Sequence, residues 1–142
     1  MLLRFDKVVR VVAPGLHRAY SLVLTDTGLY LIRTGSAGAL KHYRREVNGA
    51  VTPTRPLDAA MRDLQAQEDR ITSTPLDELA RQKDNYFIRL EAVDDLEVRS
   101  GKREPELWIG VTGSEHHLIF PFATLEEVQT LERALGKWLK PS

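Results

Sequence analysis

Cysteine is absent from this chain of 142 residues. Disulfides, thiolate metal sites and cysteine nucleophiles are therefore excluded. An excess of charge of either sign is missing as well, because 20 basic and 20 acidic side chains cancel. No overall field draws nucleic acid or anionic lipid to such a chain, so either partner would need a local basic patch. We expect no nucleic-acid partner.

Long hydrophobic runs are also missing. The uninterrupted apolar runs are a few residues long, far short of a membrane span, so we expect no transmembrane segment. Four charges interrupt the first ten residues, at Arg4, Asp6, Lys7 and Arg10. A signal peptide needs an unbroken apolar stretch there, so the expected compartment is the cytoplasm. The composition, 42% apolar and 28% charged, is typical of a globular protein, and the length predicts one domain over residues 1–142.

The first half of the chain begins with strands. Residues 2–13 predict a strand whose apolar pattern changes face near residues 7–9, which indicates a bulge. The stretch SLVLTDTGLYLIRTG (21–35) predicts a hairpin, with strands at residues 18–25 and 29–34 and an Asp- and Gly-containing turn between them. Both faces of this hairpin are apolar, so we expect it at the centre of a sheet, covered on one face and partly covered on the other.

A long connection and two helices follow. Residues 35–55 are rich in small residues and predict mainly a loop, within which residues 39–47 are compatible with a short strand. A helical insert is expected at about residues 56–83. Its first helix covers residues 56–70, and its second begins with Thr74 as the N-cap, followed by Pro75 and, three residues after the cap, by Asp77.

The second half predicts further strands and one helix. The strands are expected at residues 86–91, 96–100, 106–113 and 116–122, with a corner at Asp94 and Asp95 and a turn at residues 113–115. The helix covers about residues 125–139, since Thr124 and Glu127 form a capping box. Its apolar stripe is Leu125, Val128, Leu131, Leu135, Trp138 and Leu139. We expect this stripe to pack against the sheet.

This order of elements resembles the pleckstrin-homology-like (PH-like) superfold, in its bacterial branch. SLVLTDTGLYLIRTG is similar to the second and third strands of those domains, and residues 76–98 (LDELARQKDNYFIRLEAVDDLEV) resemble their short helix and the strand after it. The resemblance implies an α+β fold, in which a bent antiparallel barrel or sandwich of seven strands is closed at one end by the C-terminal helix. It also implies self-association, because bacterial relatives of this type tend to form homo-oligomers.

The densest basic stretch is KHYRRE, residues 41–46. Its candidate binding residues are Lys41, His42, Arg44 and Arg45. Guanidinium groups form forked hydrogen bonds with phosphate oxygens, so the stretch is a candidate for a head group or another phosphate-bearing partner. The alternative is a solvated edge strand whose charges discourage edge-to-edge pairing. Glu46 and the neutral total charge favour this alternative.

The resemblance suggests a second basic region. In phosphoinositide-binding relatives the loop between the first two strands carries clustered basic residues, and here Lys7, Arg10, His17 and Arg18 surround that loop. They lack the tight Lys-x-n-Arg-x-Arg spacing, so head-group binding is not carried over, but Arg18 joins the candidate binding residues. The adjacent histidines His116 and His117 should point to opposite faces of a strand, one inward and one outward, and so cannot share a metal.

No pattern indicates an active site. The GSAG stretch at residues 35–38 lacks the Lys and Ser/Thr of a P-loop, and Ser36 and Ser114 have no nucleophile-elbow sequence around them. Trp108 is expected in the core. We therefore expect no catalytic residues, metal or cofactor. The predicted function is a non-catalytic binding or assembly module for a protein partner or for a second copy, with recruitment to anionic lipid through the basic loops as the alternative.

Overall fold

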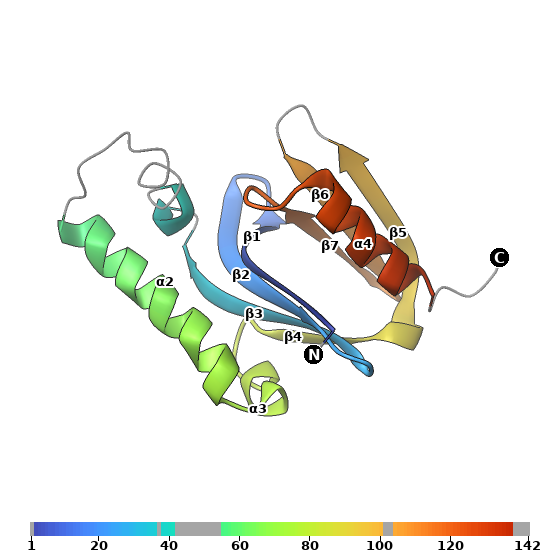
Figure 1. Cartoon of the computed structure of the whole chain (residues 1–142), viewed down its shortest axis with the longest axis horizontal. Helices are drawn as coiled ribbons and strands as arrows, with labels where there is room; N and C mark the ends of the chain where they lie inside the picture. The colour runs from blue at the N-terminus through green and yellow to red at the C-terminus, as the bar shows by residue number, and fades with distance from the viewer. Residues whose placement is uncertain (1, 37, 42–54, 101–103, 138–142) are drawn as a thin grey trace.

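The chain forms one seven-stranded antiparallel sheet with helices, an α+β fold (Figure 1). The computed structural model describes residues 2–36, 38–41, 55–100 and 104–137. The strands are β1 (Leu3–Ala13), β2 (Leu16–Leu24), β3 (Gly28–Ser36), β4 (Tyr86–Arg89), β5 (Val93–Ser100), β6 (Pro105–Val111) and β7 (Ser114–Ile119). Their order in the sheet is β4-β3-β2-β1-β7-β6-β5, so β4 and β5 lie at its two ends and the sheet is not closed.

The helices lie on two sides of this sheet. They are α2 (Arg55–Ser73), α3 (Leu76–Ala80) and α4 (Leu125–Gly136), with a 3-10 turn η1 (Leu90–Ala92) between β4 and β5. The segment 38–41 is also helical. In Figure 1, α2 lies outside the curve of β2 and β3, whereas α4 lies inside the curve of the bent sheet. The helical insert and the C-terminal helix are therefore confirmed.

The predicted hairpin forms the centre of one half of the sheet. Leu24 pairs with Leu29 next to its turn, and Thr25 Oγ1 accepts a hydrogen bond from the Gly28 amide. The predicted bulge in β1 is confirmed too, because the register with β2 shifts between Phe5 and Val8. Lys7, inside that shift, has a positive φ of 57°, which is uncommon for a residue with a side chain.

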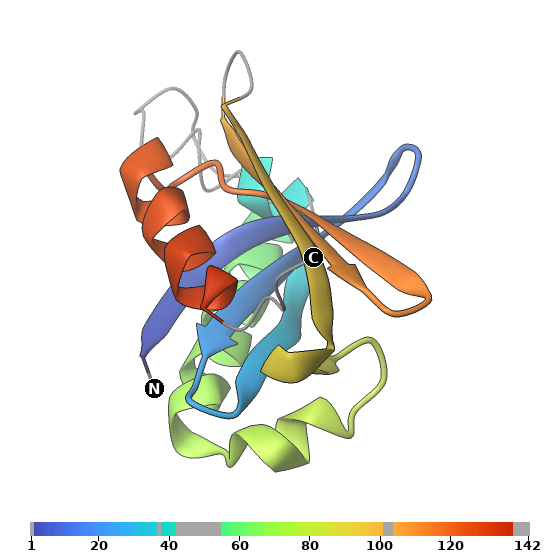
Figure 2. The ribbon, with the colours of Figure 1, turned by 90° about the vertical axis from the view of Figure 1, so that its right-hand side faces the viewer.

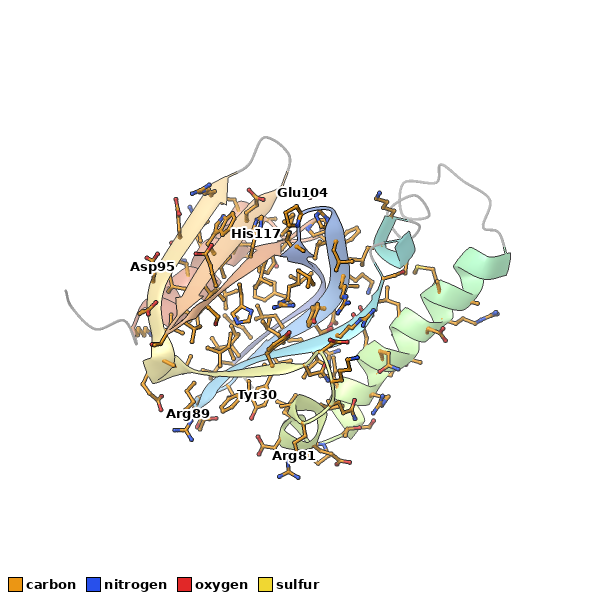
Figure 3. The ribbon with its side chains drawn as sticks, turned by 180° about the vertical axis from the view of Figure 1, so that it is seen from behind. Tyr30, Arg81, Arg89, Asp95, Glu104 and His117 are labelled. Carbon is orange, nitrogen blue, oxygen red and sulfur yellow. The ribbon has the colours of Figure 1, made fainter. Side chains whose placement is uncertain are left out.

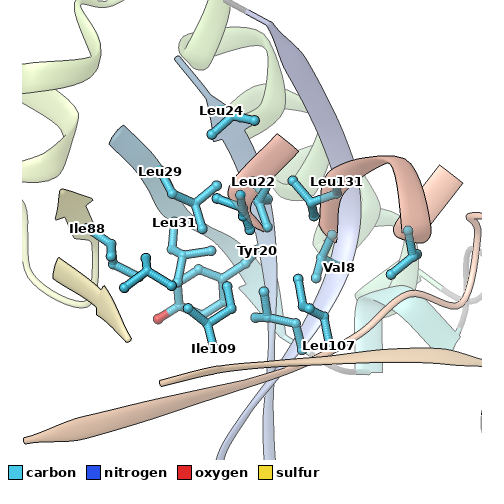
Figure 4. Packing of buried hydrophobic residues seen from close by; sticks show 14 of the residues in the cluster. Val8, Tyr20, Leu22, Leu24, Leu29, Leu31, Ile88, Leu107, Ile109 and Leu131 are labelled. Atoms are coloured by element: carbon cyan, nitrogen blue, oxygen red, sulfur yellow. The ribbon is translucent and has the colours of Figure 1, made fainter. Parts of the chain in front are cut away.

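The bent sheet and α4 enclose one apolar core, which we call the inner core (Figure 4). Its buried members are Val8, Tyr20, Leu22, Leu24, Leu29, Leu31, Ile88, Leu90, Val93, Leu107, Ile109, Leu118, Phe120, Val128, Leu131 and Leu135. They come from both halves of the sheet, so the two halves face each other across this core. The hydrophobic effect of burying these side chains is the main stabilising contribution to the fold.

The helix α4 closes one end of the inner core. The predicted capping box is present, since the Glu127 amide donates to Thr124 Oγ1 at 3.1 Å and the Thr124 amide donates to Glu127 Oε1 at 3.0 Å. Val128, Leu131 and Leu135 are each 0% exposed. The expected stripe is thus confirmed over these positions. Leu125 lies at the exposed end of the helix, and the predicted positions 138 and 139 lie outside the described residues.

The helices α2 and α3 cover the outer face of β2 and β3. Two smaller apolar clusters hold them there: Val23, Tyr30, Ile32, Ile71 and Leu79 in one, and Ala19, Ala39, Leu40 and Leu64 in the other. Polar contacts fix α2 to the β1 bulge, because Lys7 Nζ lies 2.9 Å from Glu68 Oε1 and Arg4 Nη2 donates to the Glu68 carbonyl at 2.9 Å. The expected covering of both faces of the hairpin is confirmed.

The start of α3 differs from the prediction. The helix begins at Leu76 with Pro75 as its N-cap, and no side chain caps it. The Thr74 amide instead donates to the Arg70 carbonyl at 2.8 Å, which places Thr74 at the end of α2. Asp77 accepts a 2.5 Å hydrogen bond from the hydroxyl of Tyr30, which lies between the sheet and α3 in Figure 3. Burial, together with this hydrogen bond and the Asp77 charge, raises the pKa of Tyr30 to about 12.

Two further predictions about the connections are wrong. Asp94 and Asp95 do not form a corner between strands but lie within β5, where the register with β6 shifts between Val93 and Asp95. The turn η1 instead connects β4 to β5. The possible strand at residues 39–47 is not formed at its start, since residues 38–41 are helical and Ser36 Oγ accepts a hydrogen bond from the Ala39 amide at 3.2 Å.

A glycine allows β3 and β4 to approach at the turn of the hairpin. Gly28 pairs with Arg89, and a Cβ atom built on Gly28 would overlap the ring of Phe87. The Phe87 ring stacks on Tyr30 with a centroid separation of 4.6 Å. Only a residue without a side chain leaves room for this stack.

Candidate functional site

The structure describes two of the five predicted binding residues. Arg18 lies on β2, where its Nη1 is 3.3 Å from Asp84 Oδ1. Lys41 is exposed in the helical segment 38–41. The other three predicted residues, His42, Arg44 and Arg45, lie outside the described residues. The described residues therefore do not bring Arg18 and the KHYRRE stretch together into one site.

The basic residues around the β1–β2 loop are not gathered at its tip. Lys7 pairs with Glu68 of α2, and Arg18 pairs with Asp84. Arg10 is buried, with 9% of its surface exposed. Of the four basic residues of this region, Lys7, Arg10, His17 and Arg18, only His17 is exposed to solvent. The geometry therefore gives little support to head-group binding by this loop.

The buried arginine belongs to a cluster of polar and aromatic side chains that we call the Arg10 cluster: Arg10, Tyr20, Tyr86 and His116. The Arg10 guanidinium carbon lies 4.4 Å from the ring centroid of Tyr86 and 5.5 Å from that of Tyr20, which are cation–π distances. Arg10 Nη2 lies 3.4 Å from His116 Nδ1. The predicted inward histidine is thus His116, which also packs edge-on against Tyr86 at 5.4 Å.

Four strands bring the Arg10 cluster together. Arg10 stands on β1 directly opposite Arg18 of β2 and Leu118 of β7. Because alternate residues of a strand share a face, Arg10 points to the same side as Val8, a member of the inner core. Tyr86 comes from β4 and His116 from β7. The cluster therefore lies on the inner side of the sheet, among residues that are far apart in the sequence.

Burial controls the protonation of this cluster. Burial and the neighbouring Arg10 charge lower the pKa of His116 to about 4, so its imidazole is neutral at pH 7. Burial raises the pKa of Tyr20, whose hydroxyl donates to the Asp84 carbonyl at 2.6 Å. At neutral pH the only charged member of the cluster is therefore Arg10.

A single carboxylate lies at the edge of the cluster. Asp84 has a positive φ of 70° and contacts both Arg18, at 3.3 Å, and Arg33, at 2.9 Å. Partial burial raises the pKa of Asp84, but the Arg33 hydrogen bond and the two arginine charges together lower it. Asp84 is therefore an anion already shared between two cations, neither of which is Arg10.

The sheet also offers an open edge. Strand β5 is the last in the strand order and pairs with β6 alone among the described strands. It is eight residues long, twice the length of β4 at the other end of the sheet. Helix α4 lies next to β5 in Figure 2. Leu96 and Val98 of β5 pack on the inner core, whereas Glu97 and Arg99 are exposed.

Trp108 is not a core residue, contrary to the prediction. It is half-buried on β6 between Leu107 and Ile109, which both point into the inner core, so its own side chain points outward. Its ring stacks on His117 with a centroid separation of 3.7 Å, and His117 Nε2 lies 2.9 Å from Glu106 Oε1. His117 is thus the predicted outward histidine.

A cleft of about 140 Å³ lies between the β1 bulge and the start of α4. It is lined by Arg4, Phe5, Asp6, Lys7, Val8, Phe120, Phe122, Ala123 and Glu127. Its polar side chains already have structural partners, since Arg4 pairs with Asp6 at 3.0 Å and Glu127 belongs to the capping box. Their arrangement serves the fold and does not converge on an open reacting position.

Comparison with known proteins adds no relative: no family, no curated protein and no solved structure matches the chain. Within the described ranges, no three His, Asp or Glu side chains stand close enough together to hold a metal ion. No helix in that part of the chain is both long enough and apolar enough to cross a membrane.

The sequence contained part of the signal for the Arg10 cluster. The inward histidine was predicted, and Val8, Arg10 and Val12 alternate in one strand, which places a charge on an apolar face. The partners were not predictable, because Tyr86 and His116 reach Arg10 only through the pairing of distant strands. The sequence therefore did not single out Arg10, although it is the most deeply buried cation of its loop region.

Proposed function

We propose that this chain is a non-catalytic binding module of PH-like architecture that takes up an extended protein segment along the open edge of β5, beside α4. The strand order, with seven antiparallel strands and a C-terminal helix inside the bend of the sheet, supports the PH-like assignment. The observation that carries the binding function is the unpaired outer edge of the eight-residue β5.

An extended peptide adds to such an edge through main-chain hydrogen bonds, and side-chain pockets supply the specificity. Sheet edges that receive no partner are normally protected by a bulge, a proline or charged side chains, and the charged Glu97 and Arg99 of β5 neutralise each other at 2.9 Å. β5 has a bulge only at its start, between Val93 and Asp95, and the rest of the strand keeps a regular register with β6 as far as Ser100. This regular part is long enough to pair with a partner strand.

The test uses the full chain and peptides selected from a random display library. In titrations followed by amide NMR, the selected peptides should shift the signals of β5 and α4 and should slow hydrogen exchange at the β5 amides that point away from β6. N-methylation of the peptide should abolish binding at alternate positions only, because alternate amides of an added strand face the sheet. Peptides methylated at the intervening positions, whose amides face away from the sheet, are the matched controls and should still bind.

Loss of binding at every methylated position, or signal changes confined to the β1–β2 hairpin, would contradict strand addition. A second copy of the chain is one possible partner for the same edge. Light scattering should then report a mass that is a multiple of 16.1 kDa and that falls on dilution. A constant monomer mass would leave only a foreign segment as the partner.

Recruitment to anionic lipid is the weaker alternative, because Lys7 and Arg18 are already paired with carboxylates. It predicts sedimentation with vesicles containing phosphatidylserine, weakening as salt is added. We expect no such sedimentation at low salt.

A further inference from the structure

The inner side of the sheet carries more positive charge than its carboxylates neutralise. Arg10 and Arg18 are directly opposed on β1 and β2, an arrangement in which like charges destabilise a strand pair. Asp84 compensates Arg18 and Arg33. Arg10, the most buried of the three arginines, forms no ion pair within the described part of the chain. The structure thus holds a buried guanidinium whose counter-ion is not among the described residues.

Most of the hydrogen-bonding groups of Arg10 are also without a partner within the described ranges. Its Nε and both hydrogens of Nη1 are buried and have no partner among the described residues. Nη2 has only the long 3.4 Å contact with the ring of His116. A buried charge that lacks a counter-ion and most of its hydrogen bonds is unfavourable, so its retention needs a compensating interaction.

We propose that the Arg10 guanidinium is a binding site for a carboxylate group supplied by a ligand. This site goes beyond the proposed function, because it is built from residues of β1, β2, β4 and β7 and does not use the edge of β5.

The surroundings of Arg10 select the carboxylate over phosphate. Tyr86 lies over the face of the guanidinium at 4.4 Å, so its ring does not use the N–H groups, which lie in the guanidinium plane. A guanidinium forms forked hydrogen bonds with carboxylate and with phosphate alike, so charge decides between them: a carboxylate carries one negative charge, whereas a phosphate group carries about −1.5 to −2 at pH 7. The neutral His116 leaves one positive charge in the Arg10 cluster, which one carboxylate balances.

The first measurement is an NMR titration of the full chain with sodium acetate, against sodium chloride at equal ionic strength. Acetate should shift the amide signals of Arg10, Tyr86 and His116 in a saturable way, and chloride should not. A bound carboxylate also favours the protonated imidazole next to it, so the pKa of His116 should rise from about 4 as acetate saturates. A saturable response to inorganic phosphate but not to acetate would overturn the carboxylate assignment.

A second pair of probes identifies the source of the carboxylate. A short peptide with a free C-terminal carboxylate and the same peptide as its amide are titrated in the same way. Binding of the free acid at least tenfold tighter than acetate, with no binding of the amide, assigns the site to a polypeptide end. Binding of the free acid no tighter than acetate assigns it to a small organic acid. Absence of any saturable response to acetate and to the free acid overturns the proposal.

Variants connect the response to Arg10. Arg10→Met keeps an unbranched, apolar stem and removes the guanidinium and its charge, so it should abolish the acetate response. Arg62→Met, at an exposed arginine of α2 outside the cluster and away from β5, is the matched control and should respond like the wild type. At acetate ten times above its Kd, the folding equilibrium of the wild type should shift about tenfold toward the native state, and that of Arg10→Met should not shift.

The proposal fails if Arg10→Met retains the acetate response. Should that variant not fold, Arg10→Lys provides the same comparison, since it keeps the charge and loses the planar fork. It should bind acetate at least about tenfold more weakly than the wild type. An unchanged affinity in Arg10→Lys would overturn the proposed fork geometry.

Discussion

The inner side of the sheet has two regions of opposite character. Where α4 packs, the buried residues are apolar, and Val128, Leu131 and Leu135 are completely covered. Around Arg10, the side chains are a buried cation, a buried neutral imidazole, the buried Tyr20 and the partly buried Tyr86. The apolar region gains stability from every side chain that it buries, whereas the Arg10 cluster contains a charge whose burial is unfavourable. The comparison teaches that α4 stabilises the fold. The Arg10 cluster is instead the region where a bound ligand would offset the unfavourable burial of a charge.

The largest expected effect lies in the apolar region. Leu131→Ala removes a fully buried side chain between α4 and the sheet and should lower the free energy of unfolding by about 2–5 kcal/mol. Leu125→Ala, on the same helix but 36% exposed, should lower it by less than about 1 kcal/mol. Urea denaturation measures both. Equal effects of the two substitutions would show that the helix does not close the inner core as described.

The second expected effect is a dependence of stability on pH, and it tests the Arg10 cluster. His116 has a pKa of about 4 in the folded chain and 6.5 in the unfolded one. Between these values the unfolded state binds more protons, so stability should fall as the pH drops from about 6.5 to 4, by on the order of 2–3 kcal/mol from this residue. Urea denaturation at a series of pH values measures how steeply the free energy of unfolding changes with pH.

In His116→Gln the free energy of unfolding should depend less on pH over that range, because the glutamine side chain does not titrate. Ile109→Val, a core change without a titrating group, should lower stability at every pH without changing the slope. An unchanged slope in His116→Gln would contradict the buried, neutral state of the imidazole. Carboxylate groups titrate over the same range, so the difference between wild type and variant is the quantity to compare.

The smallest of these effects concerns the end of α4. Thr124→Ala removes the acceptor for the Glu127 amide and should cost about 1 kcal/mol of stability. Thr130→Ala, at an exposed position in the middle of the same helix, should change stability by no more than about 0.5 kcal/mol. Thermal unfolding distinguishes the two. If Thr124→Ala is as mild as Thr130→Ala, the capping box contributes little to holding α4 on the core.

The sequence predicted the apolar region better than the charged one, for a physical reason. The hairpin and α4 carry their signals locally: alternation around Gly28 in one, and Thr124, Glu127 and a stripe of spacing three and four in the other. The surroundings of Arg10 depend on strand pairings between residues about a hundred positions apart. No local pattern specifies which strands meet, so its partners could be found only from the fold.

Two errors have equally specific causes. Trp108 was placed in the core by its size, although its neighbours Leu107 and Ile109 already occupied the inward positions of β6. Thr74 has the residue type of an N-cap, but its amide completes the last turn of α2. In the first case strand alternation overrides hydrophobicity, and in the second a helix end competes with a helix start for the same residue.

The contact between Gly28 and Phe87 has a consequence for how this sequence can change over time. The phenylalanine ring fills the volume that any side chain at position 28 would need. The backbone carbonyl oxygen of Ile88 lies 2.7 Å from the same Cβ position, so a side chain at 28 would meet the main chain as well as the ring. A smaller residue at 87 therefore does not free position 28, which stays restricted to glycine whatever side chain stands at 87.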